Sequence, residues 1–275
     1  MKPKIIIHCA DIHIRNVQRQ EEYGEVLEAF INKCAEIASN YEREEVRIVI
    51  CGDLVHSKTT ISNELFITAS AFLRELEKIA DVIVISGNHD LLMNNKSRTD
   101  TLTALFETAE FEHCTFIDSV LDYESGIVCD NDVMWALYSI HDDYKRPDIE
   151  GAREENPNSL VIGLYHAPIV GSILDNGTTS ESGSDMSIFE GCDIVMAGDI
   201  HKRQVLKYKG VKIVYPGSLI QQTFGETVSS HGFVVWNLED GSHEFVDVES
   251  QYGMYNIEIE DIKDLDEDKE KITNP

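Results

Sequence analysis

Three short apolar runs near the N-terminus alternate with two amphipathic stretches, and this alternation constrains the fold more than any other feature of the sequence. The runs are KIIIHCA (4–10), VRIVIC (46–51) and DVIVIS (81–86). Residues 20–41 and 62–80, which lie between them, repeat apolar side chains at helical spacing. Nearly continuous apolar strands joined by helices predict right-handed βαβ units, and therefore an α/β fold whose sheet is covered on both faces.

The rest of the chain supplies further strands of two kinds. Three more apolar runs are DVMWALYSI (132–140), SLVIGLYH (159–166) and DIVMAG (193–198). The pattern then changes to short strands joined by turns, at 204–217 and 231–248, with Asp240-Gly241 as a hairpin turn. We expect these last strands to form a second, more antiparallel sheet in the same domain.

Composition and charge narrow the function classes. The chain has 275 residues, 42% of them hydrophobic, which is enough for one large domain or for one domain with a small appendage. Its 23 basic and 50 acidic residues give a formal net charge of −27, which argues against a broad basic footprint for nucleic acid or for an anionic membrane. Phosphate substrates are compatible with this charge if bound cations supply the positive charge at the site.

Targeting signals and cysteine spacing favour the cytoplasm. The N-terminal apolar stretch is too short for a signal peptide, and no run approaches the roughly 18 apolar residues of a membrane span. The six cysteines are scattered without a C-x-x-C pair, and Cys9 and Cys51 lie in predicted strands, where reduced, buried thiols are expected. A reducing cytoplasm without membrane association fits these features best.

Polar side chains follow five of the predicted strands, each at its C-terminal end. They are Asp11 and His13; Asp53 and His56; Asn88, His89 and Asp90; His166; and Asp199 and His201. Taken singly, an Asp-x-His or a Gly-Asp turn is common, and a lone histidine is more often a hydrogen-bonded core residue than a ligand. Open α/β sheets build their binding sites at the carboxyl ends of strands, so the ordered set predicts one composite metal site.

The types and number of ligands indicate the metal chemistry. Carboxylate, imidazole and amide groups without thiolates suit intermediate divalent ions such as Mn²⁺, Fe²⁺ or Zn²⁺. About seven ligands exceed the needs of one ion and predict a pair about 3.5–4 Å apart, bridged by a carboxylate and able to clamp a phosphate. Gly52, Gly87 and Gly198 precede the ligands, and we expect them to let the backbone turn sharply at the strand ends.

The motifs DIH, GDLVH, GNHD, YHAP and GDIH, in this order, resemble those of the calcineurin-like metallophosphoesterases over about residues 4–225. GDLVH with His56, followed by YPGSLIQQTFGE (215–226), further resembles the SbcD-type nuclease subunits of DNA double-strand-break repair complexes, a group that includes bacteriophage recombination endonuclease subunits. This resemblance implies a four-layer α/β/β/α sandwich with two mixed sheets. It also implies two divalent metal ions, with Mn²⁺ expected ahead of Fe²⁺, Zn²⁺ or Mg²⁺, and hydrolysis of phosphodiester bonds in DNA.

The same resemblance implies partners and a cellular setting. The expected partners are a DNA substrate and an SbcC-type ABC ATPase with a long coiled coil, and a homodimer is left open. The expected location is the cytoplasm of a bacterium or of an infected host cell.

Carried over position by position, the resemblance implies a division of the metal ligands. One ion would be held by Asp11, His13 and His201, the other by Asn88 and His166, with Asp53 bridging the two. Related nucleases commonly have Gly-His-x-His at the last motif, whereas this chain has GDIH, which places Asp199 where a histidine of the second ion is expected. Because aspartate is a competent hard ligand, we favour a retained site with an altered metal preference over a lost ligand.

Three further residues are expected to act beside the metals. His89 would face the scissile phosphate and either stabilise transition-state charge or protonate the leaving oxygen. His56 would contact the substrate near the site. Asp90 would orient His89 from behind, as catalytic histidines commonly require.

The C-terminal segment is a second departure from the related nucleases. We divide the chain into a nuclease domain, residues 1–250, and an acidic segment, residues 251–275, in which 258–271 carry eight acids and three lysines. A solvated or frayed terminus is the simpler interpretation of this segment, and the start of a truncated capping domain is the other. The sequence leaves open whether the chain is a catalytic fragment or a minimal form.

Three functions are compatible with these features. The first is a metal-dependent DNA nuclease subunit, which the GDLVH and YPGSL motifs favour. The second is a phosphomonoesterase or a small-molecule phosphodiesterase on the same scaffold, which the net charge of −27 favours. The third is a non-catalytic acidic scaffold, against which the complete set of aspartate, asparagine and histidine residues argues.

Overall fold

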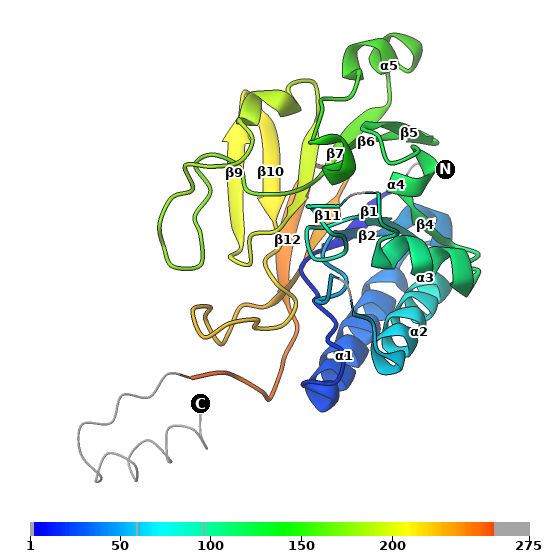
Figure 1. The fold of residues 1–275 in the computed structure, drawn as a ribbon. Coiled ribbons are helices and arrows are strands. Elements are labelled where there is room, and N and C mark those ends of the chain that lie inside the picture. The colour runs from blue at the N-terminus through cyan, green and yellow to red at the C-terminus, as the bar shows by residue number, and fades with distance from the viewer. Residues whose placement is uncertain (1–2, 59, 96, 256–275) are drawn as a thin grey trace, which may run out of the picture.

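The computed structural model describes residues 3–58, 60–95 and 97–255 (Figure 1). Its first half follows the predicted alternation of strands and helices. The elements are β1 (Ile5–Cys9), α1 (Gln20–Ala38), the short 3₁₀ helix η1 (Arg43–Glu45), β2 (Val46–Cys51), α2 (Asn63–Ile79) and β3 (Asp81–Ile85). Because β1 pairs with β2 and β2 with β3, both in parallel, the two expected βαβ units are present.

The first sheet contains six strands in the order β12-β11-β1-β2-β3-β4. Its remaining members are β4 (Cys114–Phe116), β11 (Gly232–Asn237) and β12 (Ser242–Asp247). Two helices that the sequence analysis missed, α3 (Thr101–Ala109) and α4 (Ile117–Val120), lie between β3 and the second sheet in chain order. Both helices and β4 are too short for their hydrophobic period to stand out in a sequence.

The second sheet also contains six strands, in the order β5-β6-β7-β8-β10-β9. They are β5 (Gly126–Asp130), β6 (Val133–Tyr138), β7 (Leu160–His166), β8 (Ile194–Gly198), β9 (Gln204–Tyr208) and β10 (Val211–Tyr215). Three short helices are inserted between them: η2 (Ile140–Asp142), α5 (Ile149–Glu155) and η3 (Met186–Phe189). β6, β7 and β8 are parallel and were predicted, whereas β5 was not.

The two C-terminal hairpins form as predicted, but the expectation that they make a sheet of their own is wrong. β11 pairs with β1, so the second hairpin extends the first sheet. β10 pairs with β8, so the first hairpin extends the second sheet. β10 and β11 are largely buried, and each has a partner on both sides, which leaves no exposed edge along these apolar strands. The local pattern of apolar and turn residues predicts a hairpin. The strand next to which that hairpin packs is decided by the assembled core.

Three buried clusters separate four layers, which confirms the expected α/β/β/α sandwich. Helices α1 and α2 pack on the outer face of the first sheet through side chains that include Phe30 and Phe72 (Figure 1). Trp135 and Trp236 belong to the cluster between the two sheets. Phe189 and Ile149, from η3 and α5, pack on the outer face of the second sheet. The two sheets are therefore held face to face, with their strand ends side by side.

The described part of the acidic C-terminal segment contacts the body of the protein. The backbone N–H of Met254 donates to the side chain of Gln221 at 2.7 Å, and the Gln221 amide donates back to the Met254 carbonyl at 3.1 Å. The acidic stretch 258–271 lies outside the described residues. Among the described helices, none combines the length and the apolar character that crossing a membrane requires.

Candidate metal centre

Strands from both sheets end at one edge of the sandwich, and the polar residues predicted at strand ends gather there. In the first sheet, parallel pairing places Cys51 of β2 opposite Ile85 of β3. In the second sheet, it places His166 of β7 opposite Gly198 of β8. The imidazole Nδ1 of His166 donates to the carbonyl oxygen of Cys51 at 2.6 Å, which joins the two sheets at this edge. The site is therefore built across both sheets.

The carboxylate of Asp53 lies between two histidines that come from different sheets. Its Oδ1 is 3.3 Å from Nε2 of His166, and its Oδ2 is 3.5 Å from Nε2 of His13. Only 2% of the Asp53 residue is exposed. A carboxylate that presents one oxygen to each side is arranged as a bridging ligand would be.

Two overlapping groups of side chains could each hold a metal ion. One group is Asp11, His13 and His201, and the other is Asp11, Asp53 and His166; within each group, the potential ligand atoms lie within 4.8 Å of one another. Asp11 belongs to both groups. Nε2 of His13 and Nε2 of His201 are 3.2 Å apart, so both rings point into the first group. The overlap fits a pair of ions at one centre.

The donor atoms also fit divalent cations. In the neutral ring, Nδ1 of His166 donates to a carbonyl and Nε2 carries the lone pair; this buried nitrogen faces the Asp53 carboxylate and has no donor among the described residues. Oδ1 of Asn88 is likewise buried without a partner. Buried acceptors are normally satisfied. Two acceptors without donors, beside the carboxylates of Asp11 and Asp53, are suited to bind a cation.

Asp199 occupies a place next to the second group. Its Oδ1 accepts a hydrogen bond from Nδ2 of Asn88 at 2.8 Å and lies 3.9 Å from Nε2 of His166. The bond to Asp199 uses the amide nitrogen of Asn88 and leaves the amide oxygen free. Asp199 therefore orients Asn88, a role that the sequence analysis did not anticipate, and its position beside His166 is compatible with a direct role as a ligand.

Several candidate ligands adopt backbone angles that are rare for residues other than glycine. The φ angles are 53° at Asp11, 54° at His13, 53° at Asp53 and 89° at Asp199. Such conformations cost about 1–3 kcal/mol each and persist only where the surroundings hold them. Here the first loop is held to the second, because the backbone N–H of His13 donates to the carbonyl of Asp53 at 2.9 Å.

The glycines before the ligands have a different role from the expected one. We expected all three to supply the sharp turns, but only Gly52 has a positive φ, of 83°. Gly87 and Gly198 instead allow close approach. A Cβ atom at Gly87 would lie 2.2 Å from Oδ1 of Asp53, and one at Gly198 would lie 2.1 Å from the carbonyl oxygen of Cys51. The turns themselves are made largely by the ligands.

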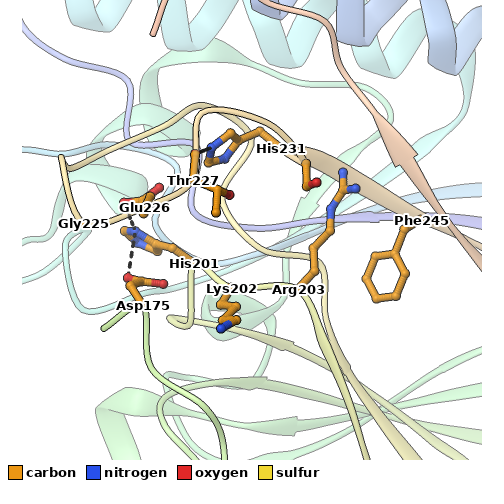
Figure 2. Close-up of a pocket in the computed structure, with 10 residues that line it drawn as sticks. Asp175, His201, Lys202, Arg203, Gly225, Glu226, Thr227, His231 and Phe245 are labelled. Atoms are coloured by element: carbon orange, nitrogen blue, oxygen red, sulfur yellow. Dashed lines mark hydrogen bonds and ion pairs between the residues drawn. The ribbon is translucent and has the colours of Figure 1, made fainter. Parts of the chain in front are cut away.

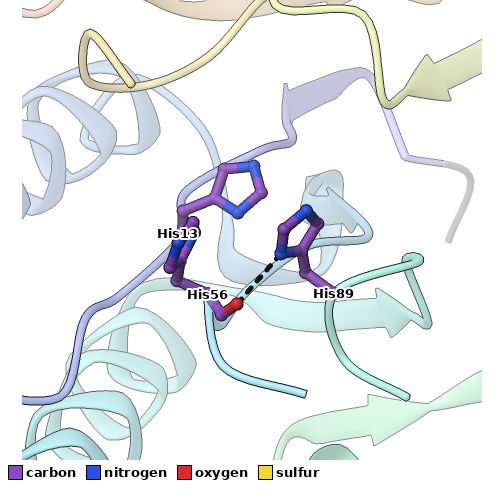
Figure 3. Close-up of side chains that lie close together, drawn as sticks. All are labelled: His13, His56 and His89. Atoms are coloured by element: carbon purple, nitrogen blue, oxygen red, sulfur yellow. Dashed lines mark hydrogen bonds between the residues drawn. The ribbon is translucent and has the colours of Figure 1, made fainter. Parts of the chain in front are cut away.

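Three histidines form the side of the centre shown in Figure 3. The rings of His13 and His89 are 4.7 Å apart between centroids, and those of His56 and His89 are stacked at 5.1 Å. Nδ1 of His89 donates to the carbonyl oxygen of His56 at 2.9 Å, which leaves Nε2 of His89 as the second hydrogen-bonding atom of the ring. Burial, followed by the positive charge of Arg15, lowers the pKa of His56 to about 4. His56 and His89 are partly exposed, whereas His13 is buried.

Among the described residues, the Asp90 carboxylate forms its hydrogen bonds with backbone amides and not with the His89 ring that it was expected to orient. Its Oδ2 accepts from the backbone N–H groups of Asp53 and Gly87, both at 2.8 Å, and its Oδ1 accepts from that of Val55 at 3.1 Å. The side chain is fully buried. Asp90 thus fixes the backbone of the loop that carries Asp53 and of the turn before Asn88. Sequence spacing cannot distinguish a carboxylate that binds backbone amides from one that binds a neighbouring ring.

The family of the chain follows from a comparison with family models. The model for calcineurin-like phosphoesterases matches residues 5–214, most of the chain and every candidate ligand. The chain belongs to the calcineurin-like phosphoesterases. This family consists of hydrolases that act on phosphoesters and depend on two metal ions, in agreement with the two overlapping ligand groups.

Individual relatives of this phosphoesterase give less information about its function than the family does. An uncharacterized protein of Acanthamoeba polyphaga mimivirus is 34% identical over 266 residues, which cover 94% of this chain and 19% of that protein. The chain thus spans about a fifth of the length of this curated relative.

Two solved structures are distantly similar. One is described as a novel archaeal phosphodiesterase, with 15% identity, 87% of this chain and 97% of that chain covered, and a TM-score of 0.39. The other is a hypothetical protein from Pyrococcus horikoshii, with 14% identity, 100% and 95% covered, and a TM-score of 0.46. At this level of similarity, neither informs on the substrate of the phosphoesterase.

One residue of the phosphoesterase site was missed by the sequence analysis. Glu226 closes the motif at 215–226, and its Oε1 accepts a hydrogen bond from Nδ1 of His201 at 2.9 Å (Figure 2). Although burial acts in the opposite direction, this bond raises the pKa of His201 to about 9. The pair lines a cavity of about 430 Å³ together with Asp175, whose Oδ2 is 4.0 Å from the same nitrogen. The motif itself was the available signal, but spacing alone did not show which ring Glu226 contacts.

Proposed function

We propose that this phosphoesterase is a metal-dependent DNA nuclease, acting as an exonuclease or endonuclease through a two-metal site. The observation that carries the proposal is the contact between the metal centre and a partly exposed histidine pair. His89 and His56 stack on each other beside His13, a member of the first ligand group. A phosphate bound at the centre would therefore contact the imidazole rings of His56 and His89 on the side that faces away from the buried ligands.

In this proposal the candidate ligands are divided between two metal ions. Asp11, His13 and His201 would hold one ion; Asn88, His166 and Asp199 would hold the other; and Asp53 would bridge them. Mn²⁺ is the ion we expect, ahead of Fe²⁺, Zn²⁺ or Mg²⁺. Divalent ions bound there supply Lewis-acid polarisation of a phosphate and activation of water.

The protein side chains supply positioning and proton transfer. With its Nδ1–H committed to the carbonyl of His56, His89 has Nε2 available to hydrogen-bond a phosphate oxygen or to protonate the leaving oxygen. His56, whose pKa is held near 4, meets the substrate as an uncharged ring at neutral pH. Asp90 keeps the two loops in register through their backbone amides.

The proposed biological role is that of the nuclease subunit of a DNA repair or recombination complex. The formal charge of −27 leaves few contacts for a DNA duplex. We therefore propose an SbcC-type ABC ATPase with a coiled coil as the partner that holds the DNA. A homodimer is compatible with this assembly, in the cytoplasm of a bacterium or an infected host cell.

The same charge favours a second candidate, a phosphomonoesterase or a small-molecule phosphodiesterase. The two candidates are separated by Mn²⁺-dependent rates measured side by side on linear DNA and on p-nitrophenyl phosphate. The nuclease proposal expects cleavage of DNA that Asp53→Asn abolishes. Hydrolysis of p-nitrophenyl phosphate with no cleavage of DNA, with or without the ATPase partner, would establish the second candidate instead.

A further inference from the structure

Three of the loops that carry the site histidines also carry a cation. Arg15 comes two residues after His13, and Lys58 comes two residues after His56. Lys202 directly follows His201. The ring centroids of His56 and His201 lie 5.4 and 5.2 Å from that of His13, so the three histidines that these loops carry are close neighbours. In a chain with a net charge of −27, a cation at each of these positions calls for an explanation.

Among the described residues, no carboxylate lies within 4.0 Å of these three cations. The other described cations that likewise form no ion pair in this part of the chain are Lys33, Arg74, Arg98, Lys207 and Lys212, but none of those follows a site histidine by one or two residues. Ion pairs with carboxylates are formed by Lys4, Arg19, Arg43, Arg47, Lys78, Lys145, Arg146, Arg153, Arg203 and Lys209. Within residues 3–58, 60–95 and 97–255, Arg15, Lys58 and Lys202 form none. An acidic protein surface offers many partners for a cation, so positive charges that stay unpaired around the site are available to an anionic ligand.

Arg15 is also held in place before any ligand binds. Its Nη2 donates to Oε1 of Gln222 at 2.9 Å. Gln222 is itself buried, and its amide nitrogen donates to the carbonyl of Ile220 at 3.1 Å and to the hydroxyl of Tyr23 at 3.3 Å. Nε of Arg15 has no hydrogen-bond partner in the described part of the chain. Because the anchoring partner is a neutral amide and Nε is buried, this partly exposed guanidinium keeps its charge and its remaining terminal N–H groups for a phosphate.

The anchored guanidinium borders the substrate side of the centre. Its charge acts on His56, whose ring stacks on His89. Lys202 lies on a different side, in the wall of the cavity next to His201 (Figure 2). Arg15 and Lys202 therefore lie on different sides of the centre and apart from the ligands, where they would meet phosphates other than the one being cleaved, and Lys58 follows His56 in the same loop.

We propose that Arg15, Lys58 and Lys202 bind the phosphates that flank the scissile group in a nucleic-acid strand, with Arg15 as the principal contact. We name these three side chains the cationic rim. The inference rests on the proposed nuclease function and adds to it the residues that distinguish a polynucleotide from a small phosphoester. A small diester carries a single phosphate, so it fills the centre without reaching the cationic rim.

The experiment measures binding rather than turnover. The probe is a fluorescein-labelled oligothymidylate with a phosphorothioate backbone, which resists cleavage, and the readout is fluorescence anisotropy with Mn²⁺ at several salt concentrations. Arg15→Gln should weaken binding by about 10- to 100-fold, the scale of removing one charge-assisted hydrogen bond. The slope of log Kd against log salt should become shallower by about 0.7 for each phosphate of a single strand that the variant no longer neutralises.

Matched variants make the outcome specific. Arg15→Lys keeps the charge and should restore the salt slope while recovering only part of the affinity. Arg43→Gln removes one positive charge before β2, at the opposite end of that strand from Asp53, and should leave the Kd unchanged. Circular dichroism confirms that each variant is folded.

The two proposals can fail separately. If Arg15→Gln binds the probe with the Kd and salt slope of the parent protein, or if the parent does not bind it, the cationic rim is wrong. If the rim variants lose binding but the parent protein with Mn²⁺ and its ATPase partner leaves unmodified DNA intact, the cationic rim stands and the nuclease function is wrong.

Discussion

Nδ1 of His201 donates a hydrogen bond to the buried carboxylate of Glu226 at 2.9 Å, while Nε2 of the same ring lies 3.9 Å from Oδ1 of Asp11. Glu226 is held in turn by the hydroxyl of Ser218 and the backbone N–H of Gln222. A carboxylate behind a histidine fixes the tautomer and the direction of the ring, and it increases the basicity of the nitrogen that faces a metal.

The Glu226→Gln variant should therefore weaken metal binding without preventing it. The amide removes the negative charge but preserves the size of the side chain, and outer partners of this kind typically contribute about 10- to 100-fold to metal affinity. Isothermal titration with Mn²⁺ measures the change. The exposed Glu190 pairs with Lys209 outside the motif and provides the control Glu190→Gln. Equal Mn²⁺ affinities for both variants would show that Glu226 has no part in the site.

Asp53 is the second test of the centre. The parent protein should bind about two Mn²⁺ ions per chain, because the convergent ligands exceed the needs of one ion. Asp53→Ala should lose both, since its two oxygens face His166 and His13 in opposite directions. Equilibrium dialysis followed by elemental analysis gives the stoichiometry. Two ions retained by the variant would refute the bridging role.

Asp90→Ala should lower the free energy of unfolding, in addition to any effect on catalysis. The substitution leaves the buried N–H groups of Asp53, Val55 and Gly87 without their acceptor. Each unsatisfied buried group costs about 1–3 kcal/mol, so the free energy of unfolding should fall by several kcal/mol, about 3 or more. Urea denaturation in the absence of metal measures this loss directly. A variant as stable as the parent would mean that water replaces the carboxylate.

The sequence predicts the gathering of ligands well, because parallel strands that end in register bring their following residues to one edge. It predicts less about how each residue serves the site. Asp90 and Asp199 occupy motif positions, but their hydrogen bonds to backbone amides and to Asn88 depend on loops that are adjacent only in the folded chain. The edge that each C-terminal hairpin joins is likewise decided by the core and not by the strand pattern.

His8 gives the fold a pH dependence that can be isolated. It is fully buried in β1, and burial lowers its pKa from 6.5 to about 3. As pH falls below 6.5, the unfolded chain binds a proton at this ring while the folded chain does not, so stability is lost between pH 6.5 and about 3. From pH 7 to pH 5 the loss should be about 2 kcal/mol. Urea denaturation of His8→Leu at both pH values should show a pH effect smaller by this amount, and an unchanged effect would contradict the assignment.

Asn88 and His89 are adjacent in the chain but face different partners. The amide of Asn88 is bound to Asp199, whereas the ring of His89 is bound to the carbonyl of His56 and stacks on the His56 ring. The two side chains should therefore have separable functions, one in assembling the metal centre and the other in acting on the phosphate. His89→Gln should keep near-normal Mn²⁺ content while turnover falls by about 10²–10⁴, the scale of a lost acid–base or charge-stabilising group.

Asn88→Ala is the matched variant for this comparison, and it should lose affinity for one of the two ions because Oδ1 of Asn88 is a buried acceptor without a partner among the described residues. Metal stoichiometry and hydrolysis of bis(p-nitrophenyl) phosphate, measured on both variants, separate the two functions. If His89→Gln loses metal and activity in parallel, His89 is a ligand. In that case a further group of possible ligands would have to be counted as part of the metal centre. It consists of His13, His56 and His89, whose potential ligand atoms also lie within 4.8 Å of one another.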